Sequence, residues 1–581
     1  MSRLQQALPT DEHSQRFLRG GKLRRSLARR WPAWIVLAIV AVLVLPPVVS
    51  VLLASVQGEA GTGLDVYAEV LSRPGVQAAV WDTAVFAVLS ALLCVAVATA
   101  AAWLVARTDA RFRILVYGAC LLTFAIPAIV KTMGWILLLG PRNGLITVLI
   151  RNLPFVPDTF QMPLYTMGGM VVVQVTILFP LVFLLLTPAF LATDATLEDA
   201  ASAAGASRSQ VIRKITLPLI RPSIVAAIFL ATVLSIGAFE VPALIGIPGG
   251  ISVLSTEALS VVKSIFPDYP AGAAYSVLMM MLAAIGLFGY HRSLGRTSKY
   301  AQVSGKGYNP RQLALGRTRP IANIITVGLP LLLVSPVLIL AWASLLPTYQ
   351  PPSVEALSQI TFDNYGTVLG SESAISAVLN SLVLGTLTAV LTIALGLIVS
   401  WYRSRRPSTT SRVADYLATL PLVIPGIVLS FAIFRTFLTS PLYGSVILIL
   451  LAYVVHELPY ATRYSYSGML SLSQELEQAA RVSGASWLTV FRRVSVPILM
   501  PALLAGAAFV FLGTVRQLSA VVFLTGPGTE VAASAIYSMW EVGQLSVAAA
   551  LALIVAIATS LMGFTVYLIF RAKPGGQLFS N

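Results

Sequence analysis

Ionisable side chains within long apolar segments are the first candidates for function in this sequence. Lys131, Glu240, His456, Glu457 and Arg516 each lie inside such a segment. A charge at the centre of a membrane-spanning helix costs roughly 2.5–3.5 kcal/mol on insertion scales, so such residues indicate a function or a specific partner. They predict either a polar translocation path or ion pairs buried between neighbouring helices, and the sequence leaves both interpretations open. The path candidates are Lys131, Glu240, Glu457 and Arg516.

Two prolines are path candidates of second rank. Pro127 and Pro425 each follow an isoleucine in the middle of an apolar segment. Proline removes a backbone hydrogen bond and can kink a helix. A kink at these positions fits a helix beside a pathway, and it fits a simple adjustment of packing equally well.

Catalytic and metal chemistry find little support. The three histidines are few and scattered, and the two cysteines, Cys94 and Cys120, lie within apolar segments. No G-x-x-x-x-G-K-[ST] phosphate loop occurs, because Lys22 and Lys306 are followed by Leu and Gly and lack the required upstream glycine spacing. We therefore expect no catalytic residue, no metal site and no cofactor bound by this chain.

The composition indicates a membrane protein. Of the 581 residues, 57% are hydrophobic and 11% are charged, and the mean hydropathy is +0.84. A soluble protein carries roughly 25% charged residues. Apolar stretches of about 20 residues, long enough to cross a ~30 Å hydrocarbon core, recur along the chain. We predict twelve spans, at 31–55, 77–106, 113–140, 164–192, 221–246, 272–292, 320–346, 374–402, 411–438, 442–470, 501–526 and 546–571.

The net charge of +16 follows the expected membrane topology and does not indicate nucleic acid. Arginine and lysine cluster in the first 30 residues, in the central linker and in the loops after even-numbered spans. Cytoplasmic loops carry such an excess of positive charge, so both termini are predicted to face the cytoplasm. The first 30 residues are too long and too charged for a secretory signal peptide, and they lack its small-residue cleavage site.

A polar segment occurs twice in this otherwise apolar chain. Residues 198–218 and 477–497 align without a gap at an offset of 279, and nine of the 21 positions are identical. Trp103 and Trp401 match at an offset of 298. The repeat predicts an all-α polytopic membrane protein with two parallel halves of six spans each. The expected parts are a basic tail (1–30), a first half (31–295, polar segment 193–218), a linker (296–319), a second half (320–573, polar segment 472–497) and a C-terminal tail (574–581).

Each polar segment is predicted to form a short helix, a turn and a second helix. Gly205 and Gly484 follow the first helix, where glycine suits a left-handed C-terminal cap. Ser207 and Ser486 are placed to cap the second helix. A proline thirteen residues after each glycine is expected to stop that helix. One copy would suit a helix lying on the membrane surface, whereas two matching copies indicate a docking knob for a two-fold symmetric partner.

The repeated pattern resembles the EAA loop of binding-protein-dependent ABC importer permeases. The copies are Asp199-Ala200-Ala201-x3-Gly205-x9-Ile215-x-Leu217-Pro218 and Gln478-Ala479-Ala480-x3-Gly484-x9-Val494-x-Val496-Pro497. In that family the loop forms a coupling helix that sits in a cleft of the ATP-hydrolysing subunit. The family's lead glutamate is Asp199 in one copy and Gln478 in the other, although Glu198 and Glu477 lie one residue upstream.

The resemblance covers essentially the whole chain and implies the type I ABC importer permease fold. It implies two copies of a separate ABC ATPase subunit, which would hold ATP and Mg²⁺. It also implies a substrate-binding protein on the outer face and a place in the bacterial inner membrane. The chain itself would be a transport subunit and not an enzyme. The residues implied in coupling to the ATPase are Glu198, Asp199, Ala200, Ala201, Gly205, Ser207, Pro218, Glu477, Gln478, Ala479, Ala480, Gly484, Ser486 and Pro497.

The fused layout and phrases such as TLPLIRPSIVAAI and YGSVILILLAYVVHELPYATR most resemble the ferric-iron importer permeases. Fused thiamine and aminoethylphosphonate permeases share the layout, and polyamine permeases are related, so these substrates stay open. The main rival from another class is a secondary transporter with two six-span halves, driven by an ion gradient. Such a transporter has no reason for a docking helix between the fourth and fifth spans of each half.

Overall fold

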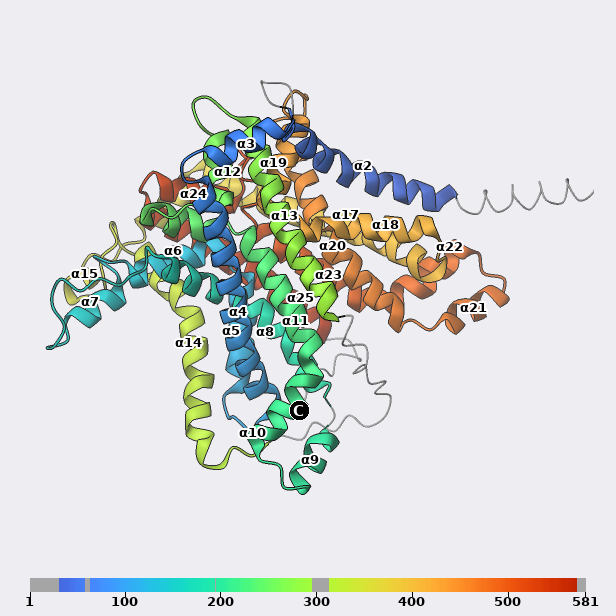
Figure 1. The fold of residues 1–581 in the computed structure, drawn as a ribbon, viewed down its shortest axis with the longest axis horizontal. Helices are drawn as coiled ribbons and strands as arrows, with labels where there is room; N and C mark the ends of the chain where they lie inside the picture. The colour runs from blue at the N-terminus through green and yellow to red at the C-terminus, as the bar shows by residue number, and fades with distance from the viewer. Residues whose placement is uncertain (1–30, 58–62, 194, 295–312, 572–581) are drawn as a thin grey trace, which may run out of the picture.

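The computed structural model describes residues 31–57, 63–193, 195–294 and 313–571, and these residues form a helical bundle (Figure 1). Ten of the described helices are long and apolar enough to cross a membrane. Three further helix pairs pass the same test together but are bent at a short break, which gives up to thirteen spans. The prediction of an all-α polytopic membrane protein is confirmed. The predicted tails at 1–30 and 574–581 and most of the linker lie outside the described residues.

Each half contributes five of the ten continuous helices, and each of the ten overlaps a predicted span. The predicted spans 221–246 and 501–526 are too long at their C-terminal ends, because α11 ends at Ile236 and α23 at Arg516. A continuous apolar run of about 20 residues is easy to recognise in a sequence, because the thickness of the bilayer sets the length of a spanning helix. The helices are α2 (Trp31–Ala54), α4 (Val76–Arg107), α8 (Met167–Leu191), α11 (Leu217–Ile236), α13 (Tyr269–Leu294), α14 (Arg319–Ser344), α17 (Glu372–Arg405), α20 (Val446–Ser471), α23 (Val496–Arg516) and α25 (Leu545–Arg571).

The remaining two predicted spans, 113–140 and 411–438, are broken rather than kinked. In the first half α5 (Arg113–Ala125) meets α6 (Ala128–Leu139) at 111°. In the second half α18 (Thr409–Thr419), continued by the turn η6 (Leu420–Val423), meets α19 (Gly426–Phe437) at 109°. Pro127 and Pro425 stand at the breaks with ψ of 143° and 141°, which is extended backbone. The expected mid-span kinks are therefore complete interruptions of the helix.

A third bent pair was not predicted from the sequence. The turns η2 (Pro242–Gly246) and η3 (Ile247–Gly249) meet α12 (Leu254–Val262) at 89°. The second half has α24 (Ala532–Glu541) at the corresponding place. Each of these short helices is fixed by the same bond: the Leu254 amide donates to Thr83 Oγ1 at 2.9 Å, and the Ala532 amide donates to Ser381 Oγ at 2.7 Å. The repeat thus extends to individual hydrogen bonds.

The two halves are interlocked by their first helices. α2 of the first half packs on α18 and α19 of the second, and α14 of the second half packs on α5 and α6 of the first. The approach of α14 to α6 requires glycine, because a Cβ on Gly134 would lie 2.1 Å from the carbonyl oxygen of Pro336. Each broken pair is thus covered by a helix of the opposite half.

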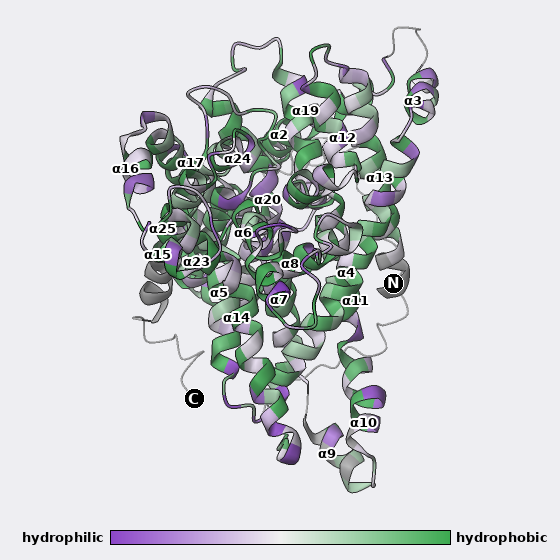
Figure 2. Cartoon of the chain, turned by 90° about the vertical axis from the view of Figure 1, so that its left-hand side faces the viewer, coloured by the Kyte–Doolittle hydropathy of each residue, from purple (hydrophilic) through white to green (hydrophobic). Residues whose placement is uncertain are grey.

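Hydrophobic residues predominate along the long helices of the bundle, and hydrophilic residues are frequent at its ends, as near α9 and α10 (Figure 2). Short elements occupy these ends. They are α3 (Gly63–Ser72), α7 (Leu145–Arg151), α9 (Ala195–Ala203), α10 (Arg208–Val211), η1 (Ile212–Thr216), η5 (Gly316–Thr318), α15 (Val354–Leu357), α16 (Asp363–Gly370), α21 (Gln474–Val482), α22 (Trp487–Val490) and η7 (Phe491–Ser495).

Candidate coupling loops and central cavity

The two polar segments fold as predicted up to their second helix, and we call them the coupling loops. In the first, α9 ends before Gly205, whose φ is +86°; in the second, α21 ends before Gly484, whose φ is +84°. Both angles belong to the left-handed region that glycine adopts without strain. The following helices are capped as expected, since Ser207 and Ser486 accept amide hydrogen bonds from the residues three positions later.

The expected stop at Pro218 and Pro497 is wrong. In both coupling loops the second helix passes through a π-helical turn, η1 or η7, and continues directly into α11 or α23. The π turn widens the helix by one residue, so proline, which lacks an amide donor, fits near the start of the long helix. The second helix of each coupling loop is therefore the beginning of a membrane helix and not a separate element.

Two buried clusters of the same design fasten the coupling loops, and we call them the anchor clusters. In the first, the Glu198 carboxylate pairs with Arg107 at the end of α4 and accepts a hydrogen bond from Thr216 Oγ1 at 2.8 Å. In the second, Glu477 pairs with Arg405 Nε at 2.8 Å and accepts from Ser495 Oγ at 2.8 Å. Counted as whole residues, Glu198 and Glu477 each expose 5% of their surface.

Each arginine also holds the chain just before the first helix of its loop, α9 or α21. Arg107 donates through Nη1 to the carbonyl of Thr193 at 3.3 Å, and Arg405 donates through Nη2 to the carbonyl of Leu472 at 2.9 Å. Thr193 and Leu472 are 279 residues apart, as are the two glutamates. Each hydrogen bond and ion pair of the first anchor cluster therefore has a counterpart between the matching residues of the second.

The other predicted coupling residues lie on the exposed side of the loops. Val482 is 89% exposed and Leu476 50% exposed, so α21 presents apolar side chains to its surroundings. α9 and α21 project from separate parts of the molecule (Figure 1). Asp199 lies in α9, but its side chain is outside the described part of the structure. The exposed or partly exposed predicted residues are Ala200, Ala201, Gly205, Ser207, Pro218, Gln478, Ala479, Ala480, Gly484, Ser486 and Pro497.

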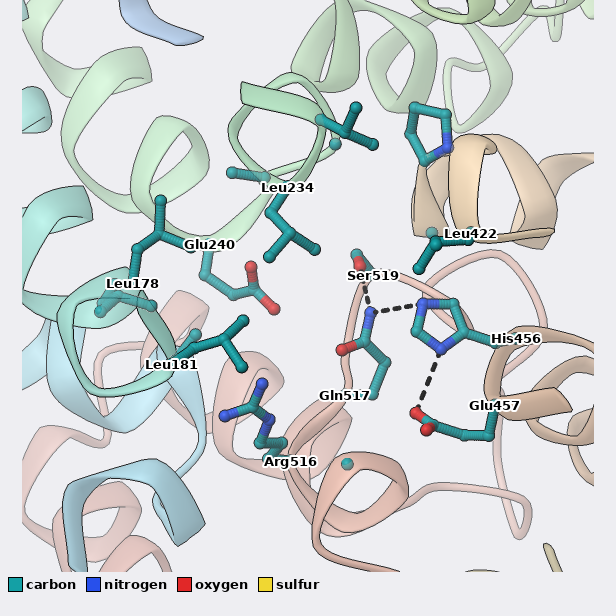
Figure 3. Close-up of a pocket in the computed structure, with 18 of the residues that line it drawn as sticks. Leu178, Leu181, Leu234, Glu240, Leu422, His456, Glu457, Arg516, Gln517 and Ser519 are labelled. Carbon is teal, nitrogen blue, oxygen red and sulfur yellow. Dashed lines mark hydrogen bonds and ion pairs between the residues drawn. The ribbon is translucent and has the colours of Figure 1, made fainter. Parts of the chain in front are cut away.

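The four charged path candidates converge on one cavity of about 140 Å³ between the two halves. Lys131 comes from α6, Glu240 from the turn after α11, Glu457 from α20 and Arg516 from the end of α23. Figure 3 shows Glu240, Glu457 and Arg516 around this space. Pro425 also lines the cavity. Pro127 does not, although the next residue, Ala128, does.

The two cations compensate for the break between α5 and α6. The last carbonyls of a helix have no partner within it, and a broken helix leaves them inside the protein. Lys131 Nζ donates to the carbonyl of Thr123 at 3.1 Å, and Arg516 Nη1 donates to that of Phe124 at 2.9 Å. Positive charge also suits the negative end of the α5 dipole. Both cations therefore have structural partners as well as a place at the cavity.

The carboxylates are held more loosely. Glu457 Oε1 lies 3.2 Å from His456 Nδ1, whereas Oε2 is buried and has no hydrogen-bond partner within the described residues. Gly513 allows this approach, because a Cβ there would lie 2.9 Å from Glu457 Oε1. Glu240 is 8% exposed, and its Oε2 accepts from the Phe239 amide at 3.4 Å.

Neutral polar residues complete the cavity and were not predicted as path residues. Gln517 Nε2 donates to Ser519 Oγ at 2.8 Å and lies 3.4 Å from His456 Nε2 (Figure 3). An uncharged amide or hydroxyl near a helix end gives no sequence signal of its own. Among the residues that the structure describes, no group of three or more His, Cys, Asp or Glu side chains is placed to hold a metal ion.

The cavity is asymmetric although the fold repeats. Each of the four charged residues has an uncharged residue at the matching position of the other half. Each charge is therefore present in one half only. At an offset of 279 the matches are Arg516 with Gly237, Glu457 with Leu178 and Glu240 with Ser519; at an offset of 298 Lys131 matches Leu429.

The chain is similar in sequence to several known transport permeases. The chain is 24% identical over 74% of its length to the ferric transport system permease protein FbpB of Actinobacillus pleuropneumoniae, and it spans 62% of that protein. It is 24% identical over 91% of its length to Fe(3+)-transport system permease protein FbpB 2 of Haemophilus influenzae, 97% of which is covered. A spermidine/putrescine transport system permease protein PotC of Escherichia coli is 26% identical over 37% of the chain and 81% of its own length.

The sequence profile of one transport family matches the chain twice, once in each half. The matched residues are 98–297 and 392–574, which include both coupling loops and all the residues that line the cavity. This chain therefore belongs to the family of binding-protein-dependent transport system inner membrane components.

Proposed function

We propose that this chain is the transmembrane subunit of an ATP-driven importer whose cargo is ferric iron, delivered by a binding protein on the outer face. The observation that carries the proposal is the continuity between each coupling loop and the central cavity. α11 begins where the first coupling loop ends and α23 where the second ends, and both finish beside cavity residues. A movement of either loop can reach the cavity through one helix.

In this mechanism two copies of a separate ATPase subunit, which carry ATP and Mg²⁺, hold the coupling loops at the cytoplasmic face. Closure of the ATPase pair draws the separated loops together and tilts α11 and α23. The two halves then move against each other, and the cavity changes from access to the cytoplasm to access to the outer face. Both termini of the chain lie in the cytoplasm in this arrangement, as the distribution of positive charge favours.

The choice of cargo rests on the relatives. The two ferric transport permeases match along 74% and 91% of this chain, whereas the polyamine permease PotC matches 37% of it. Spermidine or putrescine is therefore the second candidate. The cavity residues Lys131, Arg516, Glu240 and Glu457 contribute charges of both signs, which suits a polar cargo of either kind.

The first experiment tests the coupling loops. The tagged chain is purified from native membranes, and ATPase activity is measured for the wild type and for the double variant Gly205→Asp, Gly484→Asp. We expect an ATPase subunit to co-purify with the wild type and to be lost from the double variant. Failure of any ATPase to associate, with uptake that follows an ion gradient, would establish a secondary transporter instead.

The second experiment tests the cargo. Uptake of radiolabelled ferric iron is compared in cells that lack the gene and in cells that carry it, with radiolabelled putrescine as a parallel arm. Iron uptake that depends on the gene supports the proposal. Gene-dependent uptake of putrescine alone would replace ferric iron by a polyamine and leave the importer mechanism intact.

A further inference from the structure

The two anchor clusters connect three elements that the importer mechanism needs to move together. Glu198 belongs to the coupling helix α9, Arg107 ends α4, and Thr216 immediately precedes α11. One carboxylate therefore binds the coupling helix to the end of one membrane helix and to the foot of another. Glu477 makes the corresponding bonds in the second half.

The far ends of the two connected helices carry the cavity. α11 has 20 residues, or about 30 Å of helix, and ends at Ile236, next to Gly237 of the cavity wall. α23 ends at Arg516, which lines the cavity and donates to the carbonyl of Phe124. Each glutamate thus fastens the end of the helix opposite to the cavity.

Both pairs are shielded from water. The side chains of Arg107 and Glu198 are 2% and 7% exposed, and those of Arg405 and Glu477 are 9% and 7% exposed. Charges in such a setting are screened little, and an arginine that loses its carboxylate becomes an uncompensated buried charge. Neither carboxylate is on the exposed face of its loop, so direct contact with a partner is not their role.

We propose that Glu198 and Glu477 are positioning residues that convert movement of the coupling helices into movement of the cavity helices. This inference rests on the proposed function. Each carboxylate, with its arginine and hydroxyl partners, makes the coupling helix, the end of α4 or α17 and the foot of α11 or α23 into one rigid unit. Without the carboxylate the coupling helix can follow the ATPase while α11 or α23 stays behind.

The second half offers the cleaner test, because a matched ion pair lies at the same end of α17. Arg403 Nε is 3.6 Å from Asp415 Oδ2, and this pair joins α17 to α18. Asp415 itself lies in α18 and belongs to neither coupling loop. The variants are Glu477→Gln, the neutral double variant Arg405→Met, Glu477→Gln, and the control Asp415→Asn. Each is purified with its associated ATPase subunit and reconstituted in vesicles with the binding protein.

The measurements are ATP hydrolysis, uptake per ATP hydrolysed, and the midpoint of thermal unfolding. We expect Glu477→Gln to retain its ATPase subunit and its hydrolysis while uptake per ATP falls at least about fivefold, the lower end of typical coupling effects. The double variant should regain thermal stability, because no unpaired charge remains, but it should not regain uptake per ATP. Asp415→Asn should keep the wild-type ratio.

Three results would overturn the inference. In the first, Glu477→Gln loses thermal stability but keeps uptake per ATP, which assigns the pair to folding alone. In the second, the double variant recovers both thermal stability and uptake per ATP, which would show that the defect of Glu477→Gln came only from the unpaired charge of Arg405. In the third, Glu477→Gln no longer retains the ATPase subunit although it folds. A wild type that shows no ATP-dependent uptake would instead refute the proposed function, and the inference with it.

Discussion

Arg516 at the end of α23 binds Phe124 of α5 in the opposite half twice over. Its Nη1 donates to the Phe124 carbonyl at 2.9 Å, and its guanidinium carbon lies 4.3 Å from the centre of the Phe124 ring. A cation over an aromatic ring is attracted by the ring's negative face. The second half thereby fixes the broken helix of the first, at the wall of the cavity.

Replacement of Arg516 by methionine should therefore destabilise the protein. The substitution leaves the buried Phe124 carbonyl without its donor, which costs about 1–3 kcal/mol of unfolding free energy. Thermal unfolding in lipid nanodiscs measures the loss. Arg435→Met is the matched control, because Arg435 Nε is buried and has no hydrogen-bond partner within the described residues. Equal losses in both variants would show that the bond to Phe124 has no special weight.

Glu457→Gln should separate transport from stability. Glu457 Oε2 is buried without a hydrogen-bond partner in the described part of the chain, so its replacement by an amide breaks no hydrogen bond there and should leave the unfolding midpoint nearly unchanged. If the carboxylate serves the cargo, uptake falls nonetheless. Uptake per ATP and thermal unfolding are measured together, with Glu355→Gln in the exposed helix α15 as control. Unchanged uptake, or a lower midpoint, would argue for a structural role of Glu457.

Much of this fold could be predicted from the sequence, because its main determinants are local. The predicted span 77–106 became α4 at 76–107, since the run of apolar residues ends at the charged Arg107. The left-handed turn at Gly205 could likewise be predicted, because its signal is a single glycine after a helix.

The rest depended on contacts between distant segments. Pro127 predicted a kink. A complete break of the helix also leaves the carbonyls of Thr123 and Phe124 without helical partners, and Lys131 and Arg516 supply the missing hydrogen bonds. Arg516 lies 392 residues from its partner Phe124. The convergence of four charges from four elements on one cavity also depends on contacts between distant segments. The periodicity within a single helix cannot predict it. Helix α12 was missed because its nine residues are too few for a spanning window.

Gly484→Ala should weaken the second coupling loop through the backbone alone. No atom lies within 4 Å of the added Cβ, so the only cost is the left-handed conformation at φ +84°, about 1–2 kcal/mol for an alanine. We expect faster amide hydrogen exchange in α21. Gly118→Ala is the matched control: its Cβ also meets open space, but it lies within helix α5, where alanine is favoured. Equal exchange of the α21 amides in both variants would contradict this reading of the turn.

The segment that joins the halves is fastened to the first anchor cluster. The Leu313 amide donates to the carbonyl of Arg107 at 2.8 Å, and the Asp109 amide donates to the carbonyl of Leu313 at 3.2 Å. The Leu315 amide then donates to Asp109 Oδ1 at 2.9 Å. Arg107 therefore holds the linker with its backbone and Glu198 with its side chain.

Asp109→Ala should loosen this attachment. Loss of the hydrogen bond to the Leu315 amide, about 1 kcal/mol, raises the population of the detached segment roughly fivefold, so this amide should exchange about five times faster. The same change removes the ion pair between Asp109 Oδ2 and Arg319 Nη1 at 3.9 Å, which is partly exposed and contributes little. Hydrogen exchange measured by mass spectrometry over residues 313–318 gives the answer, with the exposed Asp158→Ala as control. Because the linker shares Arg107 with the anchor cluster, exchange in the α9 amides should rise with it. An increase at Leu315 without any change in α9 would show that the linker and the first coupling loop move independently.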